Sequence, residues 1–190
     1  MMKTSNQLCT VQIRSKPLPP QVTQLLEQSG EILKALDCQW TKNRNEDFEL
    51  SQATMDRLAE LQSQLETAFQ DAGSDWSDAV SKIWSFGPRR CGPNILLNQV
   101  PAYASRGGAF EMLRTGSISR LWEYDSSFIS GFQLATLNGP ICEESMMGVC
   151  FIVEEWILES PSQSTRLNEN DFEKTTFQNH LLSYFLISYF

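Results

Sequence analysis

Two arginines and a cysteine are enclosed by two Gly-Pro pairs near the middle of the chain, in the run Gly87-Pro88-Arg89-Arg90-Cys91-Gly92-Pro93-Asn94. Each glycine can adopt positive φ and each proline fixes φ at about −65°, so this sequence dictates most of its own backbone. We therefore expect a rigid loop that exposes Arg89, Arg90 and Cys91. Charge exposed on a rigid loop favours a role in binding.

The same run imitates a phosphate-cradling loop, because Gly87 and Gly92 have its G-x4-G spacing. In that motif Lys and Ser or Thr follow to reach the phosphates and magnesium, and the loop opens a helix. Here Pro93 and Asn94 follow, and a strand-like run begins. We predict no nucleotide-binding site and no metal site at this loop.

Cysteine usage suggests free thiols rather than disulfides. The cysteines lie at positions 9, 38, 91, 142 and 150, an odd number without a C-x-x-C pair, and no secretory signal precedes them. This pattern favours a reducing compartment and a cytoplasmic location. Because His180 is the single histidine and lies near the C-terminus, a Cys-His nucleophile pair or a zinc site with histidine has little support.

A small thiol-dependent enzyme remains an alternative, with Cys91 or Cys142 as nucleophile beside Glu143 and Glu144. Neighbouring carboxylates would raise the pKa of Cys142, which is the wrong direction for a nucleophile. The two arginines could activate Cys91 modestly, but the sequence shows no base to take its proton.

Composition predicts one folded domain, or one domain and a tail. The chain has 190 residues, of which 41% are hydrophobic, enough for a packed core. Its net charge of −8 excludes nucleic-acid binding by bulk attraction, so any RNA contact needs a local basic spot. Arg89 and Arg90 form the most concentrated such spot inside the part of the chain that is expected to fold, and we expect no binding to DNA.

The N-terminal half reads as one strand followed by helices. Residues 7–16 alternate as a strand does, and a helical pattern runs from Val22 to Leu36, weakened by Gly30. After a polar loop over 40–50, Ser51 caps a second helix that ends near Gly73, and its apolar stripe is expected to pack on its own domain. A third helix is predicted from Ser74 into the loop, with both tryptophans, at 76 and 84, facing the core.

The C-terminal half predicts a strand over 94–98, a helix from Asp125 to Asn138-Gly139-Pro140, and a central apolar strand over 148–158. Residues 99–124 have no clear period. Residues 160–176 are expected to be disordered. The aromatic end from Leu181 to Phe190 is shorter than the ~20 residues that a membrane helix needs. One interpretation of this segment is an aggregation-prone strand or tail. Membrane association through residues 177–190 is an alternative.

Three stretches in order resemble the fourth domain of the elongation factor 2 family of translational GTPases. They are Trp84-Ser-Phe-Gly-Pro-Arg-Arg-Cys-Gly-Pro-Asn94, Ser130-Gly-Phe-Gln-Leu-Ala-Thr136, and Gly139-Pro-Ile-Cys-Glu-Glu144 with Met147-Gly-Val149. Within this family the chain is most similar to the elongation-factor-like GTPases of ribosome maturation. Those proteins work with the Shwachman–Bodian–Diamond protein to release initiation factor 6 from the nascent large subunit.

The resemblance covers residues 7–158, with a helical insertion at about 38–73, and leaves 159–190 as an unrelated tail. It implies a partial α/β (α+β) domain like that of ribosomal protein S5, facing the ribosome. It also implies that Gly87, Pro88, Gly92, Pro93 and Asn94 shape the loop, while Arg89 and Arg90 contact RNA phosphate or a partner protein.

The same resemblance implies a non-catalytic chain. The phosphate, magnesium and guanine motifs of the family's GTPase domain are not found in this sequence, so we expect no GTP or magnesium requirement. We also expect the later elements of this domain and the family's fifth domain to be missing. His180 has no counterpart to the modified histidine of elongation factor 2. The predicted role is binding to the large subunit or a cofactor, or no role at all.

Overall fold

A computed structural model describes residues 2–3, 9–42, 50–101, 109–110, 122–140 and 142–158 of the chain. Within these ranges the strands form one mixed sheet in the order β1-β2-β5-β4-β3. The strands are β1 (Met2–Lys3), β2 (Cys9–Pro17), β3 (Ile83–Gly87), β4 (Asn94–Asn98) and β5 (Val149–Leu158). The β4–β5 pair is parallel and the other pairs are antiparallel, so the predicted α/β fold class is confirmed.

β5 lies at the centre of this sheet, between β2 and β4. Its continuous apolar run is buried on both faces, as expected for a strand covered on two sides. β2 pairs along its whole length with β5, from Cys9↔Leu158 to Pro17↔Val149, with a register shift between Gln12 and Ile13. The strands predicted at 7–16, 94–98 and 148–158 are therefore confirmed, with small shifts of their ends.

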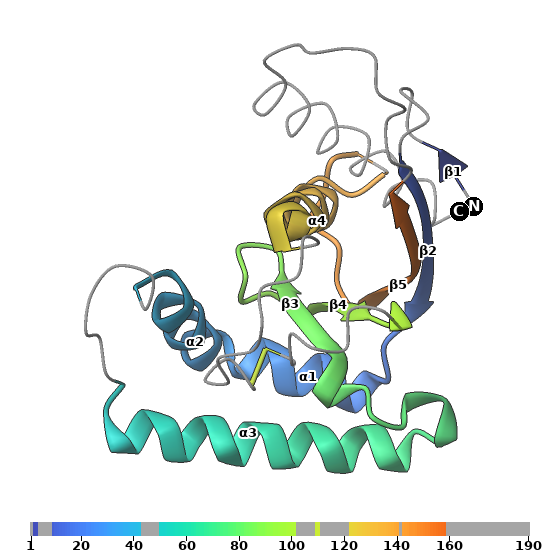
Figure 1. Cartoon of the computed structure of the whole chain (residues 1–190). Coiled ribbons are helices and arrows are strands. Elements are labelled where there is room, and N and C mark those ends of the chain that lie inside the picture. The colour runs from blue at the N-terminus through green and yellow to red at the C-terminus, as the bar shows by residue number, and fades with distance from the viewer. Residues whose placement is uncertain are drawn as a thin grey trace.

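Helices cover the two faces of the sheet (Figure 1). On one face lie α1 (Pro20–Gln28), α2 (Gly30–Lys42) and α3 (Gln52–Asp71), and on the other lies α4 (Trp122–Leu137). Each face has its own hydrophobic cluster. The first includes Leu26, Leu33, Leu65, Phe69, Ile83 and Ile95, and the second includes Trp84, Leu96, Phe128, Phe132, Phe151 and Trp156.

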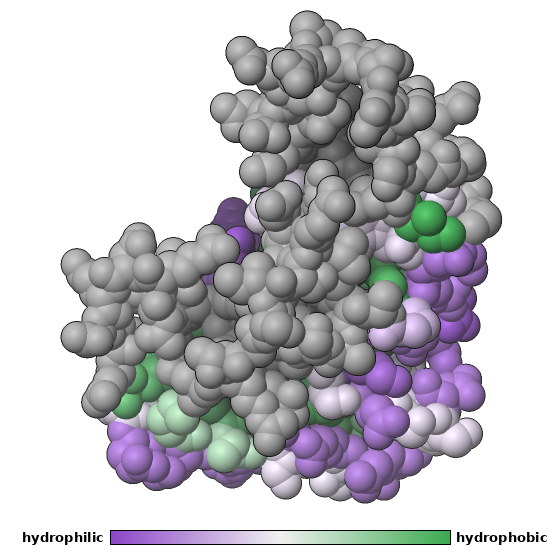
Figure 2. Space-filling view, viewed as in Figure 1, coloured by the Kyte–Doolittle hydropathy of each residue, from purple (hydrophilic) through white to green (hydrophobic). Residues whose placement is uncertain are grey.

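α3 follows its sequence prediction closely. The Ser51 hydroxyl accepts a hydrogen bond from the Thr54 N–H at 3.3 Å, which caps the helix, and Gly73 lies just beyond its end. The predicted stripe is buried in the first cluster, apart from the half-buried Met55, so α3 packs on its own domain. Figure 2 shows a mostly hydrophilic surface over α3, with apolar side chains gathered near its N-terminal end.

The helical pattern from Val22 to Leu36 belongs to two helices rather than one. α1 ends at Gln28, and its last turn closes with the Ser29 N–H donating to the Leu26 carbonyl. α2 starts at once at Gly30 and extends to Lys42, into the predicted loop. Glycine lowers helix stability at this point, and the chain changes direction there.

The helix predicted from Ser74 is wrong. The segment forms two 3₁₀ turns, η1 (Ser74–Trp76) and η2 (Val80–Lys82), and then strand β3. Trp76 and Trp84 are both buried, as predicted, but Trp76 and Ile83 join the first cluster while Trp84 joins the second. Because neighbouring strand residues point to opposite faces, a helical face through Ile83 and Trp84 cannot form.

The helix predicted from Asp125 is confirmed as α4, which starts slightly earlier and ends at Leu137 before Asn138 and Gly139. Most of 99–124, the polar stretch 160–176, His180 and the aromatic end lie outside the described residues. Among the residues that the structure does describe, no helix combines the length and apolarity needed to cross a membrane.

Candidate functional site

The candidate site is the loop of the β3–β4 hairpin. β3 and β4 pair with Ile83 opposite Leu97 and Gly87 opposite Asn94, so residues 88–93 form the connection. The peptide between Gly87 and Pro88 is cis. The loop closes on itself, because the N–H groups of Cys91 and Gly92 both donate to the Pro88 carbonyl.

Gly87 and Gly92 do not have the positive φ that the sequence suggested. Glycine is needed at both positions because neighbouring atoms leave no room for a side chain. A Cβ at Gly87 would lie 2.7 Å from the Phe132 ring, and a Cβ at Gly92 would lie 2.4 Å from Pro88 Cδ. Positive φ falls instead on Arg89 (55°) and Arg90 (58°). Left-handed backbone costs a non-glycine residue about 1–2 kcal/mol, so the surrounding contacts must hold the two arginines in place.

Asn94 fixes the end of this loop. It is fully buried, and its Nδ2 donates to the Gly87 carbonyl at 2.9 Å and to the Met146 carbonyl at 2.7 Å. Its Oδ1 accepts from the Val149 N–H at 3.0 Å. One amide thus joins both ends of the hairpin loop to the start of the central strand β5.

Gln133 on α4 holds the loop from the other side. Its Nε2 donates to the Phe86 carbonyl at 2.7 Å and to Ser85 Oγ at 3.1 Å, and its Oε1 accepts from the Arg90 N–H at 2.8 Å. The last bond acts directly on one of the two left-handed residues. Sequence reasoning missed this role, although a glutamine beside the apolar face of a predicted helix was the available signal.

The two arginines differ in their surroundings, although both are exposed. Arg90 Nη1 forms an ion pair with Asp37 Oδ1 of α2 at 3.2 Å. Arg89 forms no ion pair or hydrogen bond with any residue that the structure describes. Asp37 was not predicted, because nothing in the sequence connects α2 to a loop more than fifty residues away.

The cysteine next to these arginines does not resemble a nucleophile. Burial raises the pKa of the Cys91 thiol, and the positive charge of Lys34 opposes this only in part. Cys38, Cys91, Cys142 and Cys150 are all free thiols. Cys142 is exposed in a turn with Glu143, where both residues have positive φ. Within the described ranges, no three His, Cys, Asp or Glu side chains are grouped to hold a metal ion.

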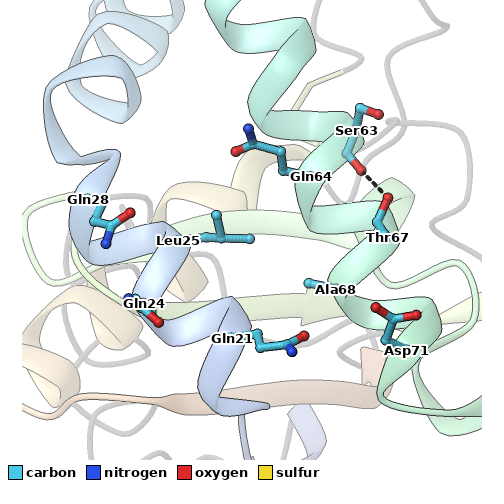
Figure 3. A pocket seen from close by; sticks show the side chains of 9 residues that line it. All are labelled: Gln21, Gln24, Leu25, Gln28, Ser63, Gln64, Thr67, Ala68 and Asp71. Atoms are coloured by element: carbon cyan, nitrogen blue, oxygen red, sulfur yellow. Dashed lines mark hydrogen bonds between the residues drawn. The ribbon is translucent and has the colours of Figure 1, made fainter.

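A separate open groove of about 500 Å³ lies between α1 and α3 (Figure 3). Among the nine described residues that line it, Asp71 is the one charged side chain, and glutamine amides line most of the α1 side. Thr67 Oγ1 donates to the Ser63 carbonyl at 3.0 Å and so turns inward to its own helix. The groove shares no lining residue with the hairpin loop.

Comparison with known proteins finds similarity to elongation factor-like GTPases and to a ribosome assembly protein. The family profile described as Elongation factor-like GTPase 1-like domain matches residues 14–99. Elongation factor-like GTPase 1 of Homo sapiens is 40% identical over 161 residues, which cover 82% of this chain and 14% of the human protein. The Mus musculus protein of that name is 38% identical over 159 residues, with the same coverage.

A more distant relative is Ribosome assembly protein 1 of Schizosaccharomyces pombe. It is 26% identical over 172 residues, which cover 83% of this chain and 16% of the yeast protein. The chain thus spans about one seventh of the length of these relatives.

Proposed function

The chain belongs to the elongation factor-like GTPase 1 family, and on that premise we propose that it is a ribosome-binding module whose β3–β4 loop contacts RNA of the large ribosomal subunit. The observation that carries the proposal is Arg89, an exposed cation without an internal ion pair among the described residues, on a loop held by Asn94 and Gln133. A guanidinium presents several donors in a planar fork that fits phosphate.

The distribution of charge supports an electrostatic contact at this loop. The chain has a net charge of −8, so RNA is repelled by most of the molecule. Binding then depends on a small number of phosphate contacts made by Arg89 and Arg90. Two such contacts weaken binding about 7- to 12-fold between about 50 mM and about 200 mM salt, because bound counterions are released when the complex forms.

The names of the relatives, which include a ribosome assembly protein, support a proposal for the biological setting. We propose that this chain acts in maturation of the large subunit in the cytoplasm, in the process that releases initiation factor 6 with the Shwachman–Bodian–Diamond protein. Its own part is binding and not catalysis. GTP hydrolysis, which the family name implies, is assigned here to other parts of the long relatives.

Co-sedimentation with purified large subunits tests this function. The full 190-residue chain is expected to pellet with the subunits at about 50 mM salt and to bind roughly tenfold more weakly at about 200 mM salt. Changing both loop arginines, Arg89→Glu and Arg90→Glu, should abolish binding. The control changes Arg57 of α3 and Lys82 of η2 to Glu, which alters net charge equally at two sites away from the loop.

Circular dichroism establishes that each variant is folded before binding is compared. A folded wild-type chain that does not bind would overturn the proposed function. Equal loss of binding in the control variant would show that net charge, and not the loop, determines the interaction.

A further inference from the structure

α2 presents one stripe of residues to the hairpin loop. At the start of the helix, a Cβ at Gly30 would lie 3.8 Å from the Cys91 carbonyl oxygen. Two turns later, Asp37 forms its ion pair with Arg90. Positions 30, 34 and 37 follow the i, i+4, i+7 spacing of a single helix face. Lys34 therefore lies between two contacts with the loop, on the face that meets it.

The charges around the loop agree with this placement. The Lys34 ammonium opposes the rise that burial causes in the pKa of Cys91. The hydrogen bond that the Lys34 ammonium donates to Glu31 raises the pKa of Lys34, while the charge of Arg89 acts in the opposite direction. Both directions are those expected of an ammonium that lies near the thiol and the guanidinium.

Lys34 is paired internally, but the pairing is of the weak, exposed kind. Its Nζ lies 2.8 Å from Glu31 Oε1, three residues earlier on the same helix, and the two side chains are 58% and 90% exposed. An exposed pair of flexible side chains contributes little to stability and is screened by salt. The pair with Glu31 therefore holds the Lys34 ammonium only weakly.

We propose that Lys34 is a third phosphate-binding residue, and that together with Arg89 and Arg90 it forms one RNA-binding patch built from α2 and the β3–β4 loop. This inference rests on the proposed function and extends it to a second element. The patch has three cations against the carboxylates of Glu31 and Asp37, so it is positive on a chain that is negative as a whole.

The salt dependence of affinity tests the role of Lys34. Affinity of the full chain for purified large subunits is measured across a salt series for wild type, Lys34→Gln, Arg89→Gln and Glu31→Gln. Each lost phosphate contact lowers the slope of log K against log salt by about 0.7–0.9, which weakens binding roughly five- to eightfold at about 100 mM salt. We expect this loss for Lys34→Gln, with recovery in Lys34→Arg.

Glu31→Gln should increase the affinity for the large subunit, because it removes the carboxylate that pairs with Lys34 and so allows the ammonium to bind RNA phosphate. Tighter binding in this variant cannot result from damage to the fold. The matched control is Arg57→Gln, an exposed cation on α3, which should leave the affinity and the salt slope unchanged.

The outcomes separate this inference from the function on which it rests. If Arg89→Gln weakens binding while Lys34→Gln leaves the salt slope unchanged, the patch does not include α2 and the inference is wrong, although the loop still binds. If the wild-type chain does not bind, both fail. Binding to intact subunits without any binding to their deproteinised RNA would assign the patch to an acidic protein and overturn the RNA contact.

Discussion

Asn94 is the residue on which the shape of the candidate site depends most directly. Its side chain makes three hydrogen bonds in a fully buried position, to Gly87, Met146 and Val149. An amide is required here because it donates twice and accepts once. A carboxylate would lack the donors, and an apolar side chain would leave three backbone groups unpaired away from water.

Replacing Asn94 with Ala should therefore cost about 2–4 kcal/mol in the free energy of unfolding, because the buried partners lose their bonds. Urea denaturation measures this loss. Asn138→Ala is the control, since that residue is exposed just after α4. A loss for Asn94→Ala no larger than that of the control would contradict the hydrogen-bond account of the loop.

Cys150 gives the described fold a defined response to alkaline pH. Burial raises the pKa of its thiol from 9.0 to about 12, opposed by Lys16 and Arg14. The unfolded chain loses this proton first as the pH rises above about 9, so the stabilisation is complete below that pH and is lost as pH rises towards 12.

Between about pH 8.5 and about pH 10, wild type should lose about 1 kcal/mol more stability than Cys150→Ala does, because only the thiol contributes this term. Urea denaturation at the two pH values measures the difference. Cys38→Ala, at an exposed position, should follow wild type. Parallel pH profiles of wild type and Cys150→Ala would refute the assignment.

At the scale of elements, sequence prediction succeeded where the residue pattern fits only one type of secondary structure. β5 is a long apolar run, α3 has a cap and a full stripe, and both formed as expected. The segment from Ser74 to Gly87 fits both a helix and a strand. Trp76, Val80 and Ile83 have the spacing of a helical face. The run from Ile83 to Phe86 also suits a strand, and the structure forms the strand. A short apolar run does not by itself distinguish a helix from a strand. Here the hydrogen-bonded pairing with β4 makes the run a strand.

The candidate site was predictable only in its local part. The Gly-Pro pairs mark the loop and Arg89 and Arg90 its charge, because these signals lie within one short run. Gln133, Lys34 and Asp37 come from two other helices, and only the packing of α2 and α4 brings them to the hairpin. Contacts between segments that are far apart in the chain have no local sequence pattern, so they cannot be predicted from a single sequence.

α4 should control the mobility of the loop through Gln133. Gln133→Ala removes the acceptor of the Arg90 N–H and the donor to the Phe86 carbonyl, while the apolar face of the helix remains. We expect faster hydrogen exchange at the Arg90 amide and a loss of about 1–2 kcal/mol in stability.

Hydrogen exchange with mass spectrometry measures this effect. Gln64→Ala serves as the control, because Gln64 bonds to Glu60 on the exposed surface of α3. Unchanged exchange at Arg90 in Gln133→Ala would mean that the hairpin holds its left-handed residues without α4.

At the scale of the molecule, helices on both faces of the sheet leave the hairpin loop at an end where α2 and α4 both reach it (Figure 1). The net charge of −8 gives the chain as a whole no bulk attraction for RNA. The open groove between α1 and α3 is lined by amides and carries one carboxylate among its described lining residues, so it offers RNA phosphate no charge attraction. We therefore expect the large subunit to contact the described surface at the patch formed by α2 and the β3–β4 loop.

Zero-length ultraviolet cross-linking tests that claim most directly. The full chain is bound to purified large subunits at low salt and irradiated, and the peptides attached to RNA are identified by mass spectrometry. We predict attachment within residues 88–93 or along α2 near Lys34. Cross-links confined to the α1–α3 groove or to residues 159–190 would contradict it.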